Sequence, residues 1–415
     1  MNFREMRKEK SRNIVFIVAF LAIVPSFLYA FIIAFDTDWS QWLPTFNYFV
    51  GYETGFGGRK LIGTFFNWLF PGTITPVHIR SFILTANFLM LALLTWFVCK
   101  ALTQRGAPSL GIALTVVLYA VGPFSLMAYV RTPLSMGFME TYQFVLLLAW
   151  LLLYLHRSDG WVYYLVTLLV SVCCILIHHA FCCTMMPAMV ALCLMDCFSS
   201  NSNIRMKLSG YGAIAVVLVV LFVMLWFLGG MNVDIDTLMA SIRERGPEVM
   251  PKDKDGFWLL YYASNEQNMQ SNIQGLPYKY VEFGISLLIL APLLYMMFYP
   301  WMSAAHRAKT LRQRWHYRSV YLTMIVLTLP IFIVATDYSR WWIGLFLGMT
   351  VVTLATYAKG DCLITNRLQT MGEYLKRHWW VAAALIIYAA QLCMIDFRGL
   401  KQAVELGWMI WPLIT

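Results

Sequence analysis

Long apolar runs separated by short polar segments are the dominant pattern of this chain. An α-helix of ~20 apolar residues crosses the ~30 Å hydrocarbon core of a bilayer. The runs are continuous rather than alternating, which excludes the pattern of a transmembrane β-barrel. We therefore predict an all-α, polytopic transmembrane helical bundle that forms a single integral membrane domain over residues 1–415. About eleven spans are expected, at roughly 13–35, 80–99, 109–130, 137–156, 161–178, 180–198, 208–229, 280–300, 318–336, 342–358 and 379–396.

Two long outer segments interrupt this up-and-down pattern. The first, 36–79, holds the apolar stretch Leu61–Phe70, which is too short to span and is typical of a helix lying in the membrane interface. The second, 230–279, is rich in charged residues and is divided by Gly246-Pro247. Loops of this length in a compact protein usually carry function.

The apolar run 161–198 is too long for one helix in a bilayer, so a tight turn is expected at His178-His179. Cysteine pairs flank these histidines at Cys173-Cys174 and Cys182-Cys183. Adjacent cysteines point to different faces of a helix, so we expect no metal site there. No cysteine falls in the long polar loop, so we expect no disulfide framework either. His178 and His179 are candidates to bind a phosphate or relay a proton, or they simply satisfy the turn.

Composition and charge indicate a multi-pass membrane protein with a defined orientation. Apolar residues make up 60% of the chain, charged residues 13%, and the mean hydropathy is +0.65. The net charge is +10, and the basic residues concentrate in the amino-terminal tail and the short loops of one side. The positive-inside rule puts that side, with the N-terminus, in the cytoplasm. Basic residues there would face anionic lipid, the stretch 306–318 included, so membrane lipid is an expected partner and nucleic acid is not.

Two carboxylates, Asp36 and Asp38, follow the first predicted span directly. They would therefore lie at the outer membrane surface, where a carboxylate suits a general base that deprotonates an acceptor hydroxyl of a lipid-borne reaction. One acid would catalyse and the other would orient. The alternative is that acids at a helix end simply mark the water interface.

A glycine-rich stretch with two cations, Gly51 to Gly63, lies in the same outer segment and includes Glu53, Arg59 and Lys60. Glycines permit close backbone approach, and a helix start beside Arg and Lys forms an anion site suited to phosphate or pyrophosphate. It is not a Walker loop, because no strand precedes it and the spacing differs. The alternative is a flexible loop whose cations reach lipid headgroups.

Further charges lie at the predicted outer ends of spans, where charge at membrane depth favours a functional interpretation. They are Arg131, Glu140, Asp337 and Arg340. We expect Arg59, Lys60, Arg131 and Arg340 to converge on one phosphate pocket. A structural Asp337–Arg340 pair at i, i+3 is the alternative.

This pattern resembles the class-C glycosyltransferases, multi-pass enzymes that use polyprenyl-phosphate sugars. In that class the catalytic Asp or Glu follows the first span, as Asp36 and Asp38 do here, in a loop that holds interfacial helices. The stretch Gly55–Gly63 is also similar to one in Wzy-type O-antigen and capsule polymerases. That resemblance implies that outer-loop arginines bind pyrophosphate, with Arg243 and Arg245 as the counterparts.

The resemblance implies transfer or polymerisation of a sugar or oligosaccharide from a polyprenyl-(pyro)phosphate donor to a glycan acceptor at the outer face of the bacterial inner membrane, in envelope polysaccharide synthesis. The competing non-enzyme class is a lipid-linked oligosaccharide flippase or other transporter, which should place its charges near the midplane. No cofactor is expected, and dependence on a divalent ion stays open.

Overall fold

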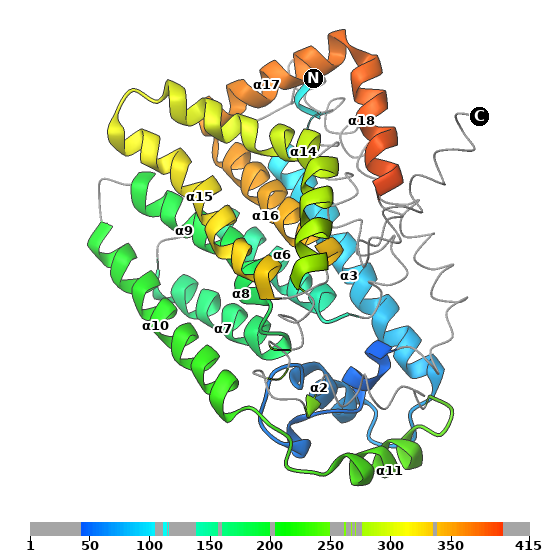
Figure 1. The fold of residues 1–415 in the computed structure, drawn as a ribbon. Helices are drawn as coiled ribbons and strands as arrows, with labels where there is room; N and C mark the ends of the chain where they lie inside the picture. Colours follow the sequence, from blue (N-terminus) through cyan, green and yellow to red (C-terminus); the bar gives the residue numbers. More distant parts are fainter. Residues whose placement is uncertain are drawn as a thin grey trace, which may run out of the picture.

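The computed structural model describes residues 43–103, 111–113, 115, 138–156, 160–199, 204–249, 261–262, 267, 270, 276–334 and 338–392. In this part of the chain every regular secondary-structure element is a helix and none is a strand, which confirms the all-α class. The principal helices, drawn in Figure 1, are α2 (Leu61–Leu69), α3 (Pro76–Thr103), α6 (Glu140–Leu155), α7 (Trp161–Ile177), α8 (Phe181–Thr184), α9 (Met186–Ser199), α10 (Ile204–Leu228), α11 (Ile235–Arg245), α14 (Leu276–Arg307), α15 (Leu311–Val334), α16 (Tyr338–Lys359), α17 (Cys362–Arg377) and α18 (Trp379–Leu392).

Within the described ranges, five helices are long and apolar enough to cross a membrane: α3, α10, α14, α15 and α16. Three shorter apolar helices, α6, α7 and α9, accompany them. Several apolar helices of this kind indicate a membrane-embedded protein. The count of eleven spans stays a prediction, because the first span and most of 109–130 lie outside the described residues.

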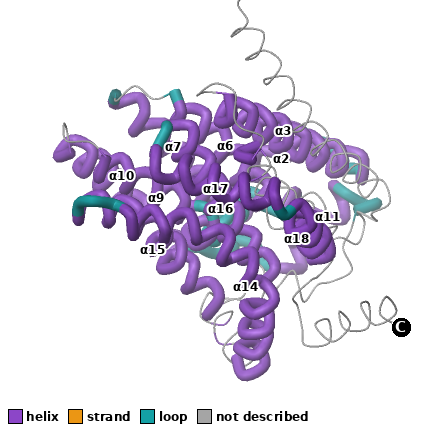
Figure 2. Tube along the Cα trace, turned by 90° about the horizontal axis from the view of Figure 1, so that it is seen from above, coloured by secondary structure: helices purple, strands orange, loops and turns teal. Residues whose placement is uncertain are grey.

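Helix α16 is the centre of the bundle. Its apolar segment is entirely buried, whereas α10 at the periphery exposes most of its surface. Helices α3, α6, α9, α14 and α15 all contact α16, and Figures 1 and 2 show them arranged around it. A helix that is apolar on all sides is expected at such a central position.

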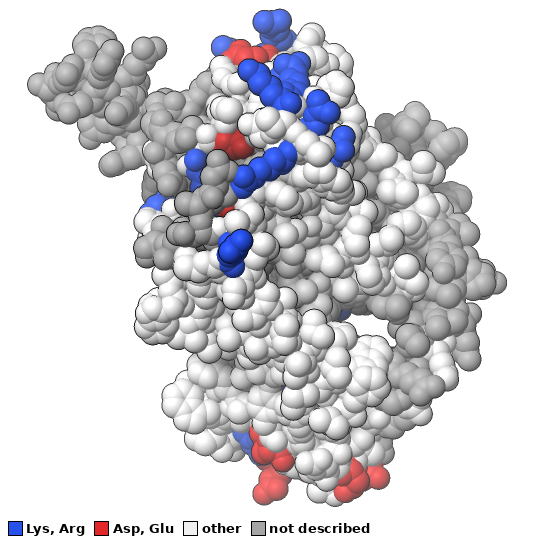
Figure 3. All heavy atoms as spheres, turned by 90° about the vertical axis from the view of Figure 1, so that its left-hand side faces the viewer, with Lys and Arg blue, Asp and Glu red and all other residues white. Residues whose placement is uncertain are grey.

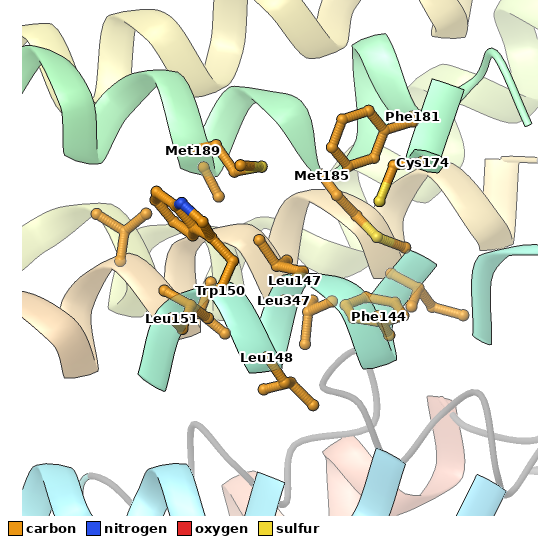
Figure 4. Packing of buried hydrophobic residues seen from close by; sticks show 14 of the residues in the cluster. Phe144, Leu147, Leu148, Trp150, Leu151, Cys174, Phe181, Met185, Met189 and Leu347 are labelled. Carbon is orange, nitrogen blue, oxygen red and sulfur yellow. The ribbon is translucent and has the colours of Figure 1, made fainter. Parts of the chain in front are cut away.

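The core beside α16 is packed from α6, α7, α8 and α9 (Figure 4). Phe144 and Trp150 of α6 are fully buried in the cluster that also holds Met185 and, from α16, Leu347. The indole Nε1 of Trp150 donates a hydrogen bond to Thr167 Oγ1 of α7 at 2.9 Å. A buried indole N–H without such a partner would be costly.

The apolar run 161–198 turns where the sequence predicts, because α7 ends at Ile177 and α8 begins at Phe181. The following span is divided, since α8 ends at Thr184 and α9 begins at Met186. Pro187 explains this break: proline has no backbone N–H and fits the first turn of a helix but not its interior.

The two ends of the bundle differ in charge. Helix α17 and the turn between α14 and α15 lie at one end, which we call the basic end, and α2 and α11 lie at the other (Figure 1). Figure 3 shows Lys and Arg gathered at the basic end, with a few Asp and Glu among them, and a group of Asp and Glu at the opposite end. This asymmetry agrees with the charge distribution predicted for a membrane protein.

Candidate functional site

The glycine-rich stretch 55–60 is held against a second segment, 229–232. The Gly230 N–H donates to Phe56 O at 2.7 Å, and the Asn232 N–H donates to Thr54 O at 2.8 Å. Gly55 adopts φ of +131°, and a Cβ on it would lie 2.5 Å from Gly230 O. Only glycine permits this approach, so the glycines of the two predicted outer segments join those segments together.

Two cations follow these glycines. Arg59 has φ of +68°, the left-handed conformation that non-glycine residues rarely adopt. Lys60 is buried, and its Nζ donates to Gly230 O at 2.8 Å. Burial lowers the pKa of Lys60 to about 8, although Glu53 opposes that shift. Helix α2 begins at the next residue, so its amino-terminal partial positive charge adds to both cations.

The His178–His179 turn lies directly beside this stretch. A Cβ on Gly58 would lie 3.2 Å from His179 Nδ1, and the two imidazole rings stack with centroids 5.0 Å apart. His178 Nδ1 accepts a hydrogen bond from the Ala180 N–H at 3.0 Å, so its proton is carried on Nε2 when the ring is neutral. Arg59 interacts electrostatically with both rings.

His179 is kept neutral by its surroundings. Burial, and then the positive charge of Arg59, lower the pKa of His179 to about 4. At neutral pH its imidazole therefore adds hydrogen-bonding capacity to the site without adding charge.

A buried ion pair completes the group. Arg340, near the start of α16, donates from Nη2 to Oε1 of Glu140, the first residue of α6. The Arg340 guanidinium also lies 4.4 Å from the ring centroid of Phe138 and 5.1 Å from that of Trp341. It interacts electrostatically with His178, which links this pair to the glycine-rich stretch.

We call these residues the His–Arg cluster: Arg59, Lys60, Glu140, His178, His179 and Arg340. Apart from the histidines, three cations and one acid give a net charge of +2. Helices α2, α6 and α16 each present their amino-terminal end to the cluster. Cations combined with helix amino termini form a site suited to phosphate or another oxyanion.

The remaining candidate residues either make contacts outside the His–Arg cluster or are not among the residues that the structure describes. Arg245 Nη2 donates to Phe70 O at 3.2 Å, and its carbonyl accepts from Ile74 N at 2.6 Å, so Arg245 holds the link between α2 and α3. Arg243 is exposed on α11. Glu53 accepts from Asn67 Nδ2 at 2.9 Å. The candidates Asp36, Asp38, Arg131 and Asp337 lie outside the described residues.

Gln143 is a polar residue of this region that the sequence did not single out. Its Nε2 donates to Cys174 O at 2.8 Å and to His178 O at 2.7 Å, so it fixes the end of α7 and the histidine turn. The sequence held one signal: Glu140 and Gln143 are three residues apart at the start of an apolar helix, so they share a face.

The described residues form no group of three or more His, Cys, Asp or Glu side chains that could hold a metal ion. Comparison with models of known protein families, with curated proteins and with solved structures finds no match for this chain.

Proposed function

We propose that this protein transfers or polymerises sugars from a polyprenyl-(pyro)phosphate-linked donor at the outer face of a bacterial inner membrane, in envelope polysaccharide synthesis. The observation that carries the proposal is the His–Arg cluster, in which Arg59 and Arg340 both interact electrostatically with His178, and Lys60 directly precedes the first residue of α2. This arrangement suits the phosphate of a lipid-linked donor and the phosphate that leaves after transfer.

The location of charge within the helices also supports an interfacial reaction. In the eight apolar helices, the described buried charged side chains lie within the first or last turn: Glu140, Asp196, Lys207 and Arg340. A transporter of lipid-linked oligosaccharide should instead place its charges near the bilayer midplane. The pattern therefore favours an enzyme over that alternative.

In the proposed reaction, an acceptor hydroxyl oxygen attacks the anomeric carbon of the donor sugar while the bond from that carbon to the phosphate oxygen breaks. The hydroxyl proton passes to Asp36 or Asp38, and the electron pair leaves with the phosphate, which the cations of the His–Arg cluster stabilise. In the Wzy-type alternative the arginines bind pyrophosphate and neither carboxylate is indispensable, so Arg243 and Arg245 become the next targets.

The function is tested by a mass spectrum of lipid-linked glycans in cells that lack this protein. Accumulated single repeat units would identify a polymerase, and an undersized glycan would identify a transferase. Lipid-linked glycan that accumulates at full size and stays protected from a glycosidase added to spheroplasts before extraction would identify a transporter instead. Glycans identical to those of the parent strain would rule out all three activities.

Complementation by Asp36→Asn, Asp38→Asn and the double variant tests the carboxylate mechanism. Loss of a general base typically lowers the rate ~10²–10⁴-fold, and these near-isosteric changes should leave expression unchanged. A double variant that restores wild-type glycan would exclude the carboxylate base and favour the arginine-centred polymerase.

The orientation is tested with an impermeant thiol reagent. Cys362 is exposed at the basic end and serves as a native reporter, and Glu244→Cys on α11 reports the opposite end. With Cys362→Ser as the background for the second probe, only the Glu244→Cys position should react in cells with an intact inner membrane. The reverse result would place the His–Arg cluster on the cytoplasmic side.

A further inference from the structure

We propose that the first turn of α6 is a sugar-hydroxyl subsite, in which oxygen atoms of Glu140 and Gln143 accept hydrogen bonds from the sugar of the donor. This inference rests on the proposed function and deepens it. It assigns recognition of the phosphate to the cations, and recognition of the sugar to two acceptors beside them.

The first observation is a pair of buried acceptors that no described residue satisfies. Glu140 and Gln143 are both fully buried, and Glu140 Oε2 and Gln143 Oε1 have no hydrogen-bond partner within the described ranges. A buried acceptor without a partner costs ~1–3 kcal/mol. Because the two residues are one turn apart on α6, their side chains share a face, and one ligand can reach both.

The second observation is that neighbouring contacts fix both side chains. Arg340 holds the other carboxylate oxygen of Glu140, Oε1. Gln143 turns its Nε2 toward two carbonyls, those of Cys174 and His178, which sets the amide orientation and leaves Oε1 as the atom without a partner. The two acceptors are therefore preorganised rather than mobile.

The chemistry of the neighbours selects the kind of ligand. An ionised carboxylate and an amide oxygen only accept, so the ligand must bring donors. The positive charges of Arg340 and Arg59 close by disfavour a cationic donor such as an ammonium group. Neutral hydroxyl or amide donors joined to an anionic phosphate fit both requirements, and a glycosyl phosphate carries both.

The test compares undecaprenyl phosphate with undecaprenyl phosphates that carry glucose, galactose or N-acetylglucosamine. Native mass spectrometry of the purified full-length protein in detergent measures competition between the sugar-free lipid and each sugar-bearing lipid. The wild type should prefer at least one sugar-bearing lipid by about tenfold or more, as expected for a hydrogen bond to a charged acceptor. A wild type without any such preference overturns the inference, whatever the variants do.

Glu140→Gln should abolish most of that preference. The same variant removes a negative charge beside the phosphate site, so its affinity for sugar-free undecaprenyl phosphate should rise while its affinity for the sugar-bearing lipid falls. If Glu140 had a merely structural role, the variant would bind both lipids more weakly to the same extent. Gln143→Met is the second variant, and it should also lose the preference.

The matched control is Asp196→Asn, which neutralises a buried acid at the other end of α16 and should keep the preference. Preference retained in both Glu140→Gln and Gln143→Met overturns the subsite while leaving the phosphate site intact. If the wild type binds neither kind of lipid, the proposed function itself fails.

Discussion

Each end of α16 carries a cation paired with a buried acid of a neighbouring helix, and the two pairs differ in how completely the acid is hydrogen-bonded. Arg340 near the start of the helix pairs with Glu140 of α6, and Lys359 at its end pairs with Asp196 of α9. Nineteen residues separate the two cations, which is about 28 Å along an α-helix and close to the thickness of a bilayer core.

At the basic end the acid uses both of its oxygens. Asp196 Oδ1 accepts from Lys359 Nζ and from the Tyr154 hydroxyl, both at 3.3 Å, and Oδ2 accepts from the Tyr211 hydroxyl at 3.2 Å. The Lys359 ammonium also lies 3.3 Å from the ring centroid of Tyr154. This network joins α6, α9, α10 and α16, and its bonds are all made within the protein.

At the opposite end the acid uses one oxygen. Glu140 Oε1 is held by Arg340, while Oε2 is buried without a partner among the described residues. Native proteins satisfy nearly all buried polar atoms. The comparison teaches that the pair at the basic end joins helices through bonds to both acid oxygens, whereas among the described residues the Glu140–Arg340 pair leaves one acceptor oxygen open, which is the atom assigned to the ligand in the proposal above.

The largest expected effect on the free energy of unfolding comes from removing Arg340, the charge partner of Glu140. Arg340→Met leaves Glu140 buried without its charge partner, and breaking a buried pair in this way costs ~3–5 kcal/mol. We expect the double variant Glu140→Gln/Arg340→Met to recover most of that loss, because no uncompensated charge remains. Thermal and denaturant unfolding in one detergent measure both proteins. A single variant as stable as the double would show that the pair is not buried in the membrane-embedded protein.

Arg59→Gln should weaken binding of undecaprenyl phosphate by ~1.5–3 kcal/mol, the range for a hydrogen bond to a charged group. The matched control is Arg312→Gln, which removes the same charge at the basic end, where Arg312 Nε donates to Phe198 O. Lipid titration followed by native mass spectrometry gives both affinities. Equal losses in the two variants would mean that lipid binding depends on overall charge rather than on the His–Arg cluster.

Asp196→Asn tests the pair at the basic end, with a smaller expected cost of ~1–2 kcal/mol in unfolding free energy. The cost is below that of Arg340→Met because the Lys359 side chain is about a third exposed and can reach water. Binding of undecaprenyl phosphate should not change. Weakened lipid binding in the folded variant would remove the distinction between the two ends.

The smallest effect is a pH dependence from Lys60, whose pKa is lowered by burial to about 8. Above that pH the ammonium loses its proton, so affinity for undecaprenyl phosphate should fall severalfold between pH 7 and 9. Stability should change in the opposite direction. Between pH 8 and 10.5 the unfolded chain binds a proton that the folded chain lacks, so the free energy of unfolding rises with pH.

Lys60→Arg provides the control for this pH dependence, because arginine stays charged throughout that range. The affinity of the Lys60→Arg variant for undecaprenyl phosphate should not change between pH 7 and 9. A wild type with an equally flat profile would show that Lys60 makes no contact with the phosphate.

The sequence predicted the apolar helices well, because a bilayer demands long apolar runs whatever their neighbours are. Two helices were missed for the complementary reason. Helix α17 and helix α11 are amphipathic and charged, so a search for long apolar runs assigns their sequences to loops. Helices α14 and α15 also extend past the predicted spans, since hydropathy detects the apolar core of a helix and not its polar ends.

The candidate site was predicted as a set of residues but not as a set of contacts. The sequence indicated Glu140 and Arg340 because charge is rare beside apolar runs, and Arg59 and Lys60 because they end a glycine-rich stretch at a helix start. It could not pair Arg340 with Glu140, two hundred residues away, and offered a local partner in Asp337 instead. Pairing across that separation is decided by helix packing, which periodicity does not encode.

The burial of α16 has a consequence for how the protein is made. Its apolar segment has no surface left for lipid, and its buried face includes the hydroxyls of Thr350, Thr353 and Thr356. Helices α3, α6, α9, α14 and α15 all precede it in the chain. Because α16 follows these helices in the chain, its place at the centre of the bundle can be filled only after they have been made.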